Sequence, residues 1–384
     1  MNPKELELYI HIPFCVKKCS YCDFLSAPAT EQTREAYMAA LFAEIEEKAK
    51  DYKDRIVTSV FIGGGTPSLL SGDCIKGLME HIREGFTLAE DAEITMEVNP
   101  GTATAEKLTA FYAAGINRLS IGMQSAQEQE LKILGRIHDF NGFCQVYREA
   151  VEAGFTNINV DVMSGLPGQT LASYRDTLEK VLRLEPMPQH ISAYSLIVEE
   201  GTPFAAMAER GELSLPEEDT ERAMYEETIE VLAKYGFHRY EISNYARGGY
   251  ECRHNVGYWI RRDYLGFGIG AASLIDNVRF QNGRDLNTYL AHPFACREEK
   301  QSLTTQEQME ETMFLGLRLV RGVSYEYFEK QYGKSPEEVY GEVIAKNVAD
   351  GLLTVREEKN RGRYLALTKR GLDVSNYVMA QFLF

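Results

Sequence analysis

Three cysteines near the start of the chain have the spacing of an iron–sulfur site. Cys15, Cys19 and Cys22 form a CxxxCxxC pattern within the segment HIPFCVKKCSYC, which covers residues 11–22. Thiolates are the soft ligands that iron–sulfur clusters require, so three cysteines in one loop can hold three irons of a [4Fe–4S] cluster. Because no fourth cysteine stands nearby, the fourth iron would stay open for an exogenous chelating group.

The alternative for the same cysteines is a structural zinc site. Such a site needs four ligands in closed tetrahedral geometry, and His11 is the candidate for the fourth ligand. His11 lies on a predicted strand, however, where alternation points its side chain away from the loop. The spacing therefore favours a cluster over zinc.

Composition and charge restrict the class of protein. The chain of 384 residues carries 41 Lys and Arg against 57 Asp and Glu, a net charge of −16. This acidic balance argues against a nucleic-acid partner. No apolar run approaches the roughly 20 residues of a membrane span, and residues 1–7 lack the apolar segment of a signal peptide. We therefore expect a cytoplasmic protein, whose cysteines are ligands or buried apolar residues rather than disulfides.

The elements that must position the cysteines follow a βα period, because short apolar runs recur about every 25–35 residues. The predicted strands cover residues 6–12, 59–62, 93–98, 118–122, 157–162 and 190–196. The predicted helices cover residues 31–50, 74–83, 105–114, 140–153, 171–184 and 217–235. This alternation predicts an α/β fold with a parallel sheet, which is either a barrel or doubly wound.

Polar or glycine-rich segments follow the end of nearly every predicted strand, and they favour the barrel. They are the cysteine loop, GGGTP at 63–67, EVNP at 97–100, Gln124 with Ser125, and Asp161 with GLPG at 165–168. In a barrel these segments converge on one rim, whereas a doubly wound sheet gathers only some of them at a switch point. We predict a barrel, closed or partly closed, over residues 1–240.

The pattern changes beyond residue 240. Residues 241–303 are predicted to be a connecting segment, with a strand at 241–245 and an aromatic, arginine-rich stretch at 253–267. Residues 304–384 are predicted to form a smaller α+β domain of winged-helix-like character. Its helices are expected at 306–320, at 336–350 and from Thr368, with strands at 352–355 and 364–367. No basic recognition helix accompanies this domain.

The cysteine pattern after a first strand resembles the radical S-adenosylmethionine superfamily. The resemblance implies a partial (β/α)6 barrel of the TIM type, which agrees with the strand count. It also implies that the methionine amino and carboxylate groups of S-adenosylmethionine chelate the open iron, and that the cluster donates an electron to cleave the sulfonium C–S bond.

The rim residues narrow the resemblance to the oxygen-independent coproporphyrinogen III dehydrogenase group, which is also called the oxidase group, over about residues 6–300. In that group, Tyr9, Gly64 and Glu97 match contacts to the cluster-bound S-adenosylmethionine. The residues that match contacts to a second S-adenosylmethionine are Tyr21, Gly65, Thr66, Gln124, Arg136 and Asp161. The resemblance thus implies one S-adenosylmethionine and leaves a second one open.

The chain departs from the dehydrogenases in two features. In these features and in one motif it resembles a sister group, the HemW-type haem chaperones. The dehydrogenases carry a fourth cysteine two residues after the third, where this chain has Phe24, and they have a long N-terminal extension, where only 14 residues precede Cys15. The segment HNVGYW at 254–259 matches the HNxxYW motif of the chaperones. The resemblance implies haem binding and haem transfer to acceptor haemoproteins.

The residue types of this motif suit haem on chemical grounds. The His254 imidazole is a competent axial ligand, and Tyr258 and Trp259 offer flat faces to a macrocycle. Guanidinium groups suit propionate carboxylates, and the nearby arginines are Arg253, Arg261 and Arg262. The alternative interpretation is a core histidine, a packing tryptophan and solvated arginines.

The remaining cysteines have no firm role. Cys252 is a weaker candidate for the haem ligand, and we interpret Cys74, Cys144 and Cys296 as buried apolar residues.

The sequence therefore predicts a cytoplasmic haem chaperone that carries a [4Fe–4S] cluster and S-adenosylmethionine and delivers haem to membrane-bound or free haemoproteins. The cluster would serve structure, homodimer formation or haem release rather than turnover. The alternative is a coproporphyrinogen III dehydrogenase, which would use a 5′-deoxyadenosyl radical for oxidative decarboxylation. An RNA-modifying radical enzyme is disfavoured by the acidic charge.

Overall fold

The computed structural model describes residues 4–294, 300–359 and 362–383. Its centre is a run of parallel strands that lie side by side in chain order. These strands are β1 (Lys4–Ile12), β2 (Arg55–Gly64), β3 (Thr87–Val98), β4 (Arg118–Gln124), β5 (Ile158–Ser164) and β6 (His190–Ser195). Because β1 and β6 do not pair among the described residues, the barrel is partial, which confirms the predicted fold class.

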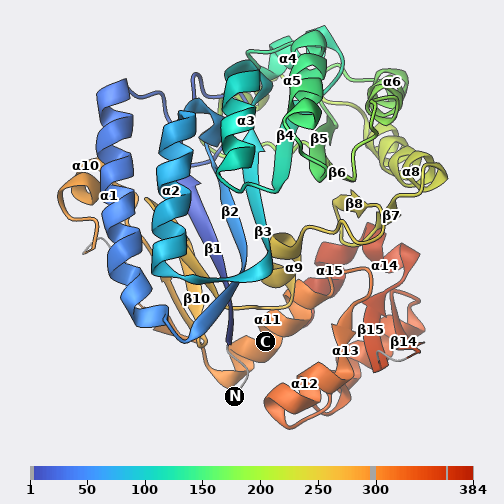
Figure 1. The fold of residues 1–384 in the computed structure, drawn as a ribbon. Helices are drawn as coiled ribbons and strands as arrows, with labels where there is room; N and C mark the ends of the chain where they lie inside the picture. Colours follow the sequence, from blue (N-terminus) through green and yellow to red (C-terminus); the bar gives the residue numbers. More distant parts are fainter. Residues whose placement is uncertain (1–3, 295–299, 360–361, 384) are drawn as a thin grey trace.

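Helices cover the outer face of this sheet, as Figure 1 shows for the neighbouring helices α1, α2 and α3. The long helices are α1 (Glu31–Ala49), α2 (Gly72–Gly85), α3 (Ala105–Ala113), α5 (Phe140–Glu152), α6 (Leu171–Leu182) and α8 (Glu218–Lys234). Most of them begin at a Ser, Thr or Asp whose side chain accepts a hydrogen bond from the first turn. Two shorter helices, α4 (Glu128–Leu134) and α7 (Pro203–Glu209), were not predicted.

The barrel strands alternate between an apolar outer face and a polar inner face. On β4, Leu119 and Ile121 are fully buried in the core beneath the helices, whereas Arg118 and Ser120 line a cavity inside the barrel. On β5, Val160 and Val162 are in the core and Asp161 lines the cavity. The strands therefore enclose a polar space, which we call the lumen.

Strands from residues 238–302 extend the sheet on both sides, and most of them come from the predicted connecting segment 241–303. Beyond β1 lie β9 (Tyr264–Phe267), β10 (Ala272–Ile275), β11 (Val278–Gln281) and β12 (Gln301–Ser302), of which only β9 pairs in parallel with its neighbour β1. Beyond β6 lie β8 (Asn244–Ala246) and β7 (His238–Arg239), both antiparallel to their neighbours. Helix α9 (Arg253–Trp259) lies against β2, and α10 (Leu286–Ala291) packs beside α1.

The C-terminal residues form an α+β unit with its own hydrophobic core, drawn in orange and red in Figure 1. Its helices are α11 (Thr305–Gly316), α12 (Tyr325–Tyr332), α13 (Pro336–Ala349), α14 (Lys369–Asp373) and α15 (Ser375–Ala380). A small sheet orders β13 (Val323–Ser324), β15 (Gly362–Leu367) and β14 (Leu353–Glu358). The unit is held to α9 by an Arg261–Glu311 ion pair of 2.9 Å and by Arg318, whose guanidinium lies 4.3 Å from the Trp259 ring centroid.

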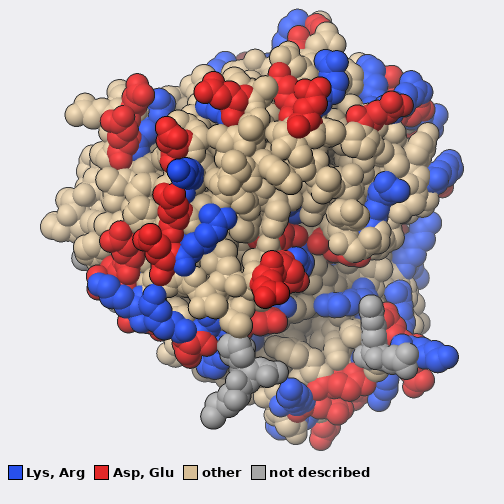
Figure 2. Space-filling view, viewed as in Figure 1, with Lys and Arg blue, Asp and Glu red and all other residues tan. Residues whose placement is uncertain are grey.

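The outer surface is mixed in charge. Figure 2 shows acidic and basic side chains interspersed over the face that carries α1, α2 and α3. Among the described residues, none of the helices combines the length and the apolar character that a membrane-crossing helix requires.

Candidate cofactor site

A cavity of about 520 Å³ occupies the lumen and opens beside the cysteine loop. Its wall brings together nearly all the residues that the sequence singled out for cofactor binding. They are Cys15, Cys19, Tyr21, Cys22, Gly64, Gly65, Thr66, Glu97, Gln124, Arg136 and Asp161. Tyr9 and His254, which were predicted to contact ligands as well, are not among the lining residues.

The cysteine loop is anchored by backbone hydrogen bonds on both sides. The Cys15 N–H donates to Ala27 O (3.2 Å), and the Ser20 N–H donates to Leu134 O at the end of α4 (3.0 Å). All three thiols are free, and Cys19 Sγ lies 3.9 Å from a guanidinium nitrogen of Arg136. The Arg136 guanidinium therefore lies beside one of the three candidate cluster ligands.

The geometry tests the zinc alternative. Among the described residues, no three His, Cys, Asp or Glu side chains are placed so that they could hold a single metal ion. A four-iron cluster does not require such convergence, because each thiolate binds a different iron. His11 is also engaged, since its ring nitrogens lie 3.0 Å from the Tyr9 hydroxyl and 2.8 Å from Leu25 O. The cysteines therefore fit a cluster better than zinc.

The glycine segment after β2 brings bare backbone to the cavity wall. Gly64 has φ +110°, and a Cβ there would lie 2.4 Å from His11 Nδ1. A Cβ on Gly65 would lie 2.6 Å from the carbonyl oxygen of Phe14 in the cysteine loop. Only glycine tolerates these approaches, so Gly64 packs closely against β1 and Gly65 against the start of the cysteine loop.

Two carboxyl groups face the lumen in unusual environments. Glu97 accepts a hydrogen bond from the Gly64 N–H (3.0 Å), and burial, reinforced by the nearby Asp161, raises the pKa of Glu97 to about 7. Burial also raises the pKa of Asp161, although Asn159 and Ser120 donate hydrogen bonds to it. Buried carboxyl groups with raised pKa values are typical of ligand sites.

Two residues predicted to contact a second S-adenosylmethionine occupy constrained positions. Gln124 has φ 69°, which is rare for a residue with a side chain, and its side-chain oxygen accepts a hydrogen bond from the Tyr194 hydroxyl (3.0 Å). Arg136 donates to Gly122 O at 2.6 Å. Strained backbone at the end of a barrel strand is a common feature of functional sites, and the second ligand stays a prediction.

His254 does not line the cavity but lies behind its wall, in the core between α9 and β2. Its side chain is 1% exposed, and its ring nitrogens lie 2.8 Å from Ser59 Oγ and 3.1 Å from the Tyr258 hydroxyl. The ring stacks on Phe61 with a centroid distance of 5.2 Å. Burial lowers the pKa of His254 to about 3, which keeps the imidazole neutral. In this conformation, His254 has the surroundings of a core histidine.

The arginines near the HNxxYW motif already have carboxylate partners. Arg253 pairs with Asp91 (2.8 Å) and Arg261 with Glu311 (2.9 Å). Arg262 pairs with Glu5 and, at 3.3 Å, with the buried Glu7. Because these partners use the guanidinium donors, the three arginines connect α9 to the barrel and to the C-terminal unit.

The cysteines outside the loop differ in burial. Cys252 is fully buried, its Sγ lies 3.5 Å from Glu93, and burial raises the pKa of its thiol to about 12. Cys74 and Cys144 are half-buried and pack against the main core, and Cys296 lies outside the described residues.

Several residues of the cavity wall had no role assigned from the sequence, and Arg118 and Asn255 are two of them. Arg118 begins β4, and Asn255 comes from α9 within the HNxxYW motif, yet both line the lumen. The signal for Arg118 was the alternation of Arg118, Ser120 and Gly122 with apolar residues, since a parallel strand covered on both sides is normally apolar throughout. Asn255 was recognised only as a member of the HNxxYW motif and was given no role of its own.

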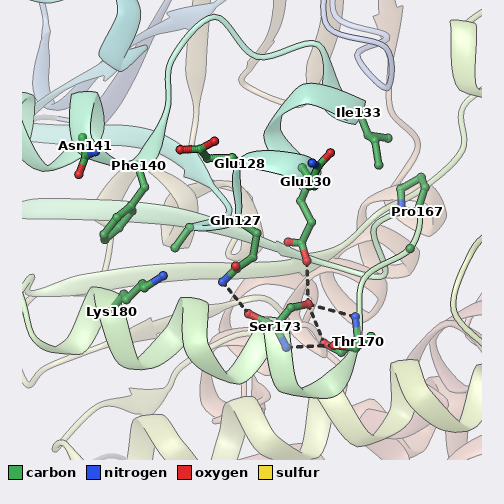
Figure 3. A pocket seen from close by; sticks show the side chains of 13 residues that line it. Gln127, Glu128, Glu130, Ile133, Phe140, Asn141, Pro167, Thr170, Ser173 and Lys180 are labelled. Atoms are coloured by element: carbon green, nitrogen blue, oxygen red, sulfur yellow. Dashed lines mark hydrogen bonds between the residues drawn. The ribbon is translucent and has the colours of Figure 1, made fainter.

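A second cavity, of about 630 Å³, lies outside the barrel near α4, α5 and α6 (Figure 3). Its buried carboxylate, Glu130, accepts hydrogen bonds from Ser173 (2.7 Å), Gln169 (3.0 Å) and Ser125 (2.5 Å). These bonds satisfy the carboxylate and connect α4 to the start of α6, so we interpret Glu130 as a structural residue.

Comparison with known proteins identifies the class and then the family. The Radical SAM superfamily model matches residues 9–181, and the HemN C-terminal domain model matches residues 303–374. Together with the partial barrel and its cysteine loop, these matches define a radical S-adenosylmethionine protein, a class that implies a [4Fe–4S] cluster and S-adenosylmethionine. More narrowly, the chain belongs to the HemW family.

The relatives cover the whole chain. The heme chaperone HemW of Lactococcus lactis is 36% identical over 100% of this chain and 98% of its own length, and that of Bacillus subtilis is 37% identical over 98% of each. A mitochondrial radical S-adenosyl methionine domain-containing protein 1 of Danio rerio is 35% identical over 97% of this chain and 84% of its own. Among solved structures, the coproporphyrinogen III oxidase HemN of Escherichia coli has a TM-score of 0.84 at 26% identity, covering 99% of this chain and 90% of that one.

Proposed function

We propose that this protein is a haem chaperone that carries a [4Fe–4S] cluster and S-adenosylmethionine in its lumen and passes haem to acceptor haemoproteins. The observation that carries the proposal is full-length similarity to relatives named as heme chaperones. Phe24 supports it, because this residue stands where the dehydrogenases have a fourth cysteine and its side chain is 58% exposed at the cavity wall. Cytoplasmic residence, a homodimer and the nature of the acceptor stay predictions.

The lumen residues have distinct roles in this proposal. Cys15, Cys19 and Cys22 would bind three irons, and the backbone at Gly64 and the Glu97 carboxyl would bind the S-adenosylmethionine on the fourth. A cluster held by these residues would supply the electron for cleavage of the C–S bond of S-adenosylmethionine in a reductive reaction, although the chaperone role does not require this turnover. Tyr9 was predicted to contact this ligand, but its hydroxyl lies behind the cavity wall, 3.0 Å from His11 Nδ1. The His11 ring in turn packs against Gly64, so Tyr9 would support the S-adenosylmethionine site indirectly.

The rival function is coproporphyrinogen III decarboxylation, which the likeness to the Escherichia coli oxidase favours. The deciding experiment uses anaerobically reconstituted full-length protein. We expect it to take up haem stoichiometrically and to leave coproporphyrinogen III unchanged in the presence of S-adenosylmethionine and a reductant. Rapid conversion to protoporphyrinogen IX, or failure to bind haem, would contradict the chaperone proposal.

Haem ligation by His254, which the HNxxYW motif predicts, can be tested against a structural role of this residue in the core. Because both ring nitrogens are hydrogen-bonded in the core, we expect His254→Ala to lower the free energy of unfolding by about 3 kcal/mol through a cavity and two unpaired hydroxyls. The Soret spectrum of bound haem should be unchanged. His81→Ala, on the outer helix α2, is the matched control and should leave both quantities near wild type. A shifted Soret band in folded His254→Ala would instead show that His254 leaves the core to bind iron.

The affinity for S-adenosylmethionine should depend on pH through Glu97. With a pKa near 7, free Glu97 is protonated below that pH, whereas a cationic ligand that hydrogen-bonds to it favours the carboxylate. Binding then releases a proton, so affinity rises as pH increases towards 7 and levels off above it. We expect binding at pH 6 to be about tenfold weaker than at pH 8. Equilibrium dialysis checks this, and Glu97→Gln should bind weakly with no such slope.

A further inference from the structure

Arg118 is a buried cation without a partner. Its side chain is 2% exposed, it points into the lumen, and it lines the cavity. Among the described residues, none forms a hydrogen bond or an ion pair with its guanidinium, and its Nε is buried without any acceptor. Burial removes water from the guanidinium, and the neighbouring Glu93 and Asp161 act on it only through space, so its hydrogen-bond donors stay open to a ligand.

The nearest carboxylates favour the charge of Arg118 through space but form no ion pair with it. Asp161 is close enough to interact electrostatically with Arg118, but its oxygens are used by Asn159 (2.7 Å) and Ser120 (3.3 Å). Glu93 is turned towards α9, where it accepts hydrogen bonds from the backbone N–H groups of Arg253 (3.1 Å) and His254 (3.2 Å). The guanidinium donors that face the lumen are therefore available to a ligand.

The surroundings of Arg118 are polar on the remaining sides. The other residues that line this part of the cavity are Asn159, Ser192, Ser243, Asn244 and Asn255. The side-chain oxygen of Asn244 is also buried and without a hydrogen-bond partner, so it would accept from an N–H or O–H group. Amide and hydroxyl groups around a guanidinium suit a carboxylate that carries polar neighbours, because a guanidinium binds a carboxylate through two parallel hydrogen bonds.

We propose that Arg118 forms an anion site at the floor of the lumen and binds the carboxylate of an organic acid that enters beneath the cluster loop. This inference rests on the proposed function, because haem and S-adenosylmethionine are the two ligands that could supply the carboxylate. One source is the propionate arm of a tetrapyrrole, and the other is the methionine carboxylate of an S-adenosylmethionine molecule. Both present the same group to Arg118, and separate binding measurements distinguish them.

The test compares reconstituted full-length wild type with Arg118→Gln. Haem and haem dimethyl ester are the probes for a propionate, and S-adenosylmethionine is titrated separately. We expect wild type to bind haem at least tenfold more tightly than the ester, and Arg118→Gln to lose this discrimination by weakening haem binding alone. A tenfold loss of S-adenosylmethionine affinity with unchanged haem binding would assign the carboxylate to S-adenosylmethionine. Unchanged affinities for all three probes would overturn the proposal.

Control variants separate binding from structure. Arg55 is also a buried arginine of the barrel, 4% exposed, but it is paired with Asp263 (2.5 Å) and Asp276 (2.7 Å). Arg55→Gln should lower the melting temperature and leave ligand discrimination unchanged. Arg118→Met replaces Arg118→Gln if the latter does not fold, and Arg118→Lys should restore part of the discrimination. If wild type binds no haem, the chaperone proposal fails while the S-adenosylmethionine titration still tests Arg118.

Discussion

Cys19→Ser should abolish cluster assembly. The three thiols line one cavity, and Cys19 is the one that lies beside the Arg136 guanidinium. A serine hydroxyl is a hard, protonated ligand that does not replace a thiolate on iron. We expect iron and sulfide in the reconstituted protein to fall from about four of each per chain to near zero, together with the visible absorption of the cluster.

The matched control is Cys144→Ser. Cys144 is half-buried on α5 and packs against the outer core, away from the lumen. Its replacement should cost about 1 kcal/mol of stability and leave the iron content unchanged. Retention of a full cluster in Cys19→Ser would contradict the ligand assignment, as would loss of the cluster in Cys144→Ser.

Gly65→Ala should separate the cysteine loop from β2. The added Cβ would lie 2.6 Å from Phe14 O and 2.9 Å from Ile12 O, and both are backbone atoms that cannot rotate away. We expect a loss of about 1–3 kcal/mol in unfolding free energy, the usual cost of overpacking. Because the displaced loop carries Cys15, we also expect the iron content after reconstitution to fall several-fold.

Gly77→Ala is the control for this glycine. Gly77 lies within helix α2, where an added Cβ would meet only the Phe42 ring at 3.6 Å, an ordinary contact. Alanine has the higher helix propensity, so this variant should gain up to about 1 kcal/mol in stability and keep its cluster. A Gly65→Ala protein with normal stability and full iron content would show that the loop does not depend on this contact.

The barrel and most of its cavity could be predicted from the sequence because their signals are local. A strand followed by a helix repeats along the chain, and residues at the ends of parallel strands meet at one rim. The structure places Glu97, Gln124 and Asp161 together for that reason. The cysteine spacing likewise needs no knowledge of distant contacts.

The remaining features depend on contacts that local patterns do not record. Strands β10 and β11 have only four residues each, which is too short for a clear pattern of alternating apolar residues. They are joined by Asp276 and Asn277, which both have positive φ, and this turn was not recognised in the sequence. The environment of His254 is set by Ser59, a residue 195 positions away. A motif of suitable residue types cannot reveal whether its histidine faces a ligand or the core.

The alternation of the barrel strands has a consequence for how such proteins diversify. The outward residues of β4 and β5 hold the helices, and the inward residues line the lumen, where Ser120, Asn159 and Asp161 also hydrogen-bond to one another. A substitution at an inward position therefore changes the surface offered to a ligand, and it affects stability where it breaks one of these hydrogen bonds. One scaffold of this kind can therefore present different inner surfaces to a ligand while the same outer face keeps the helices in place.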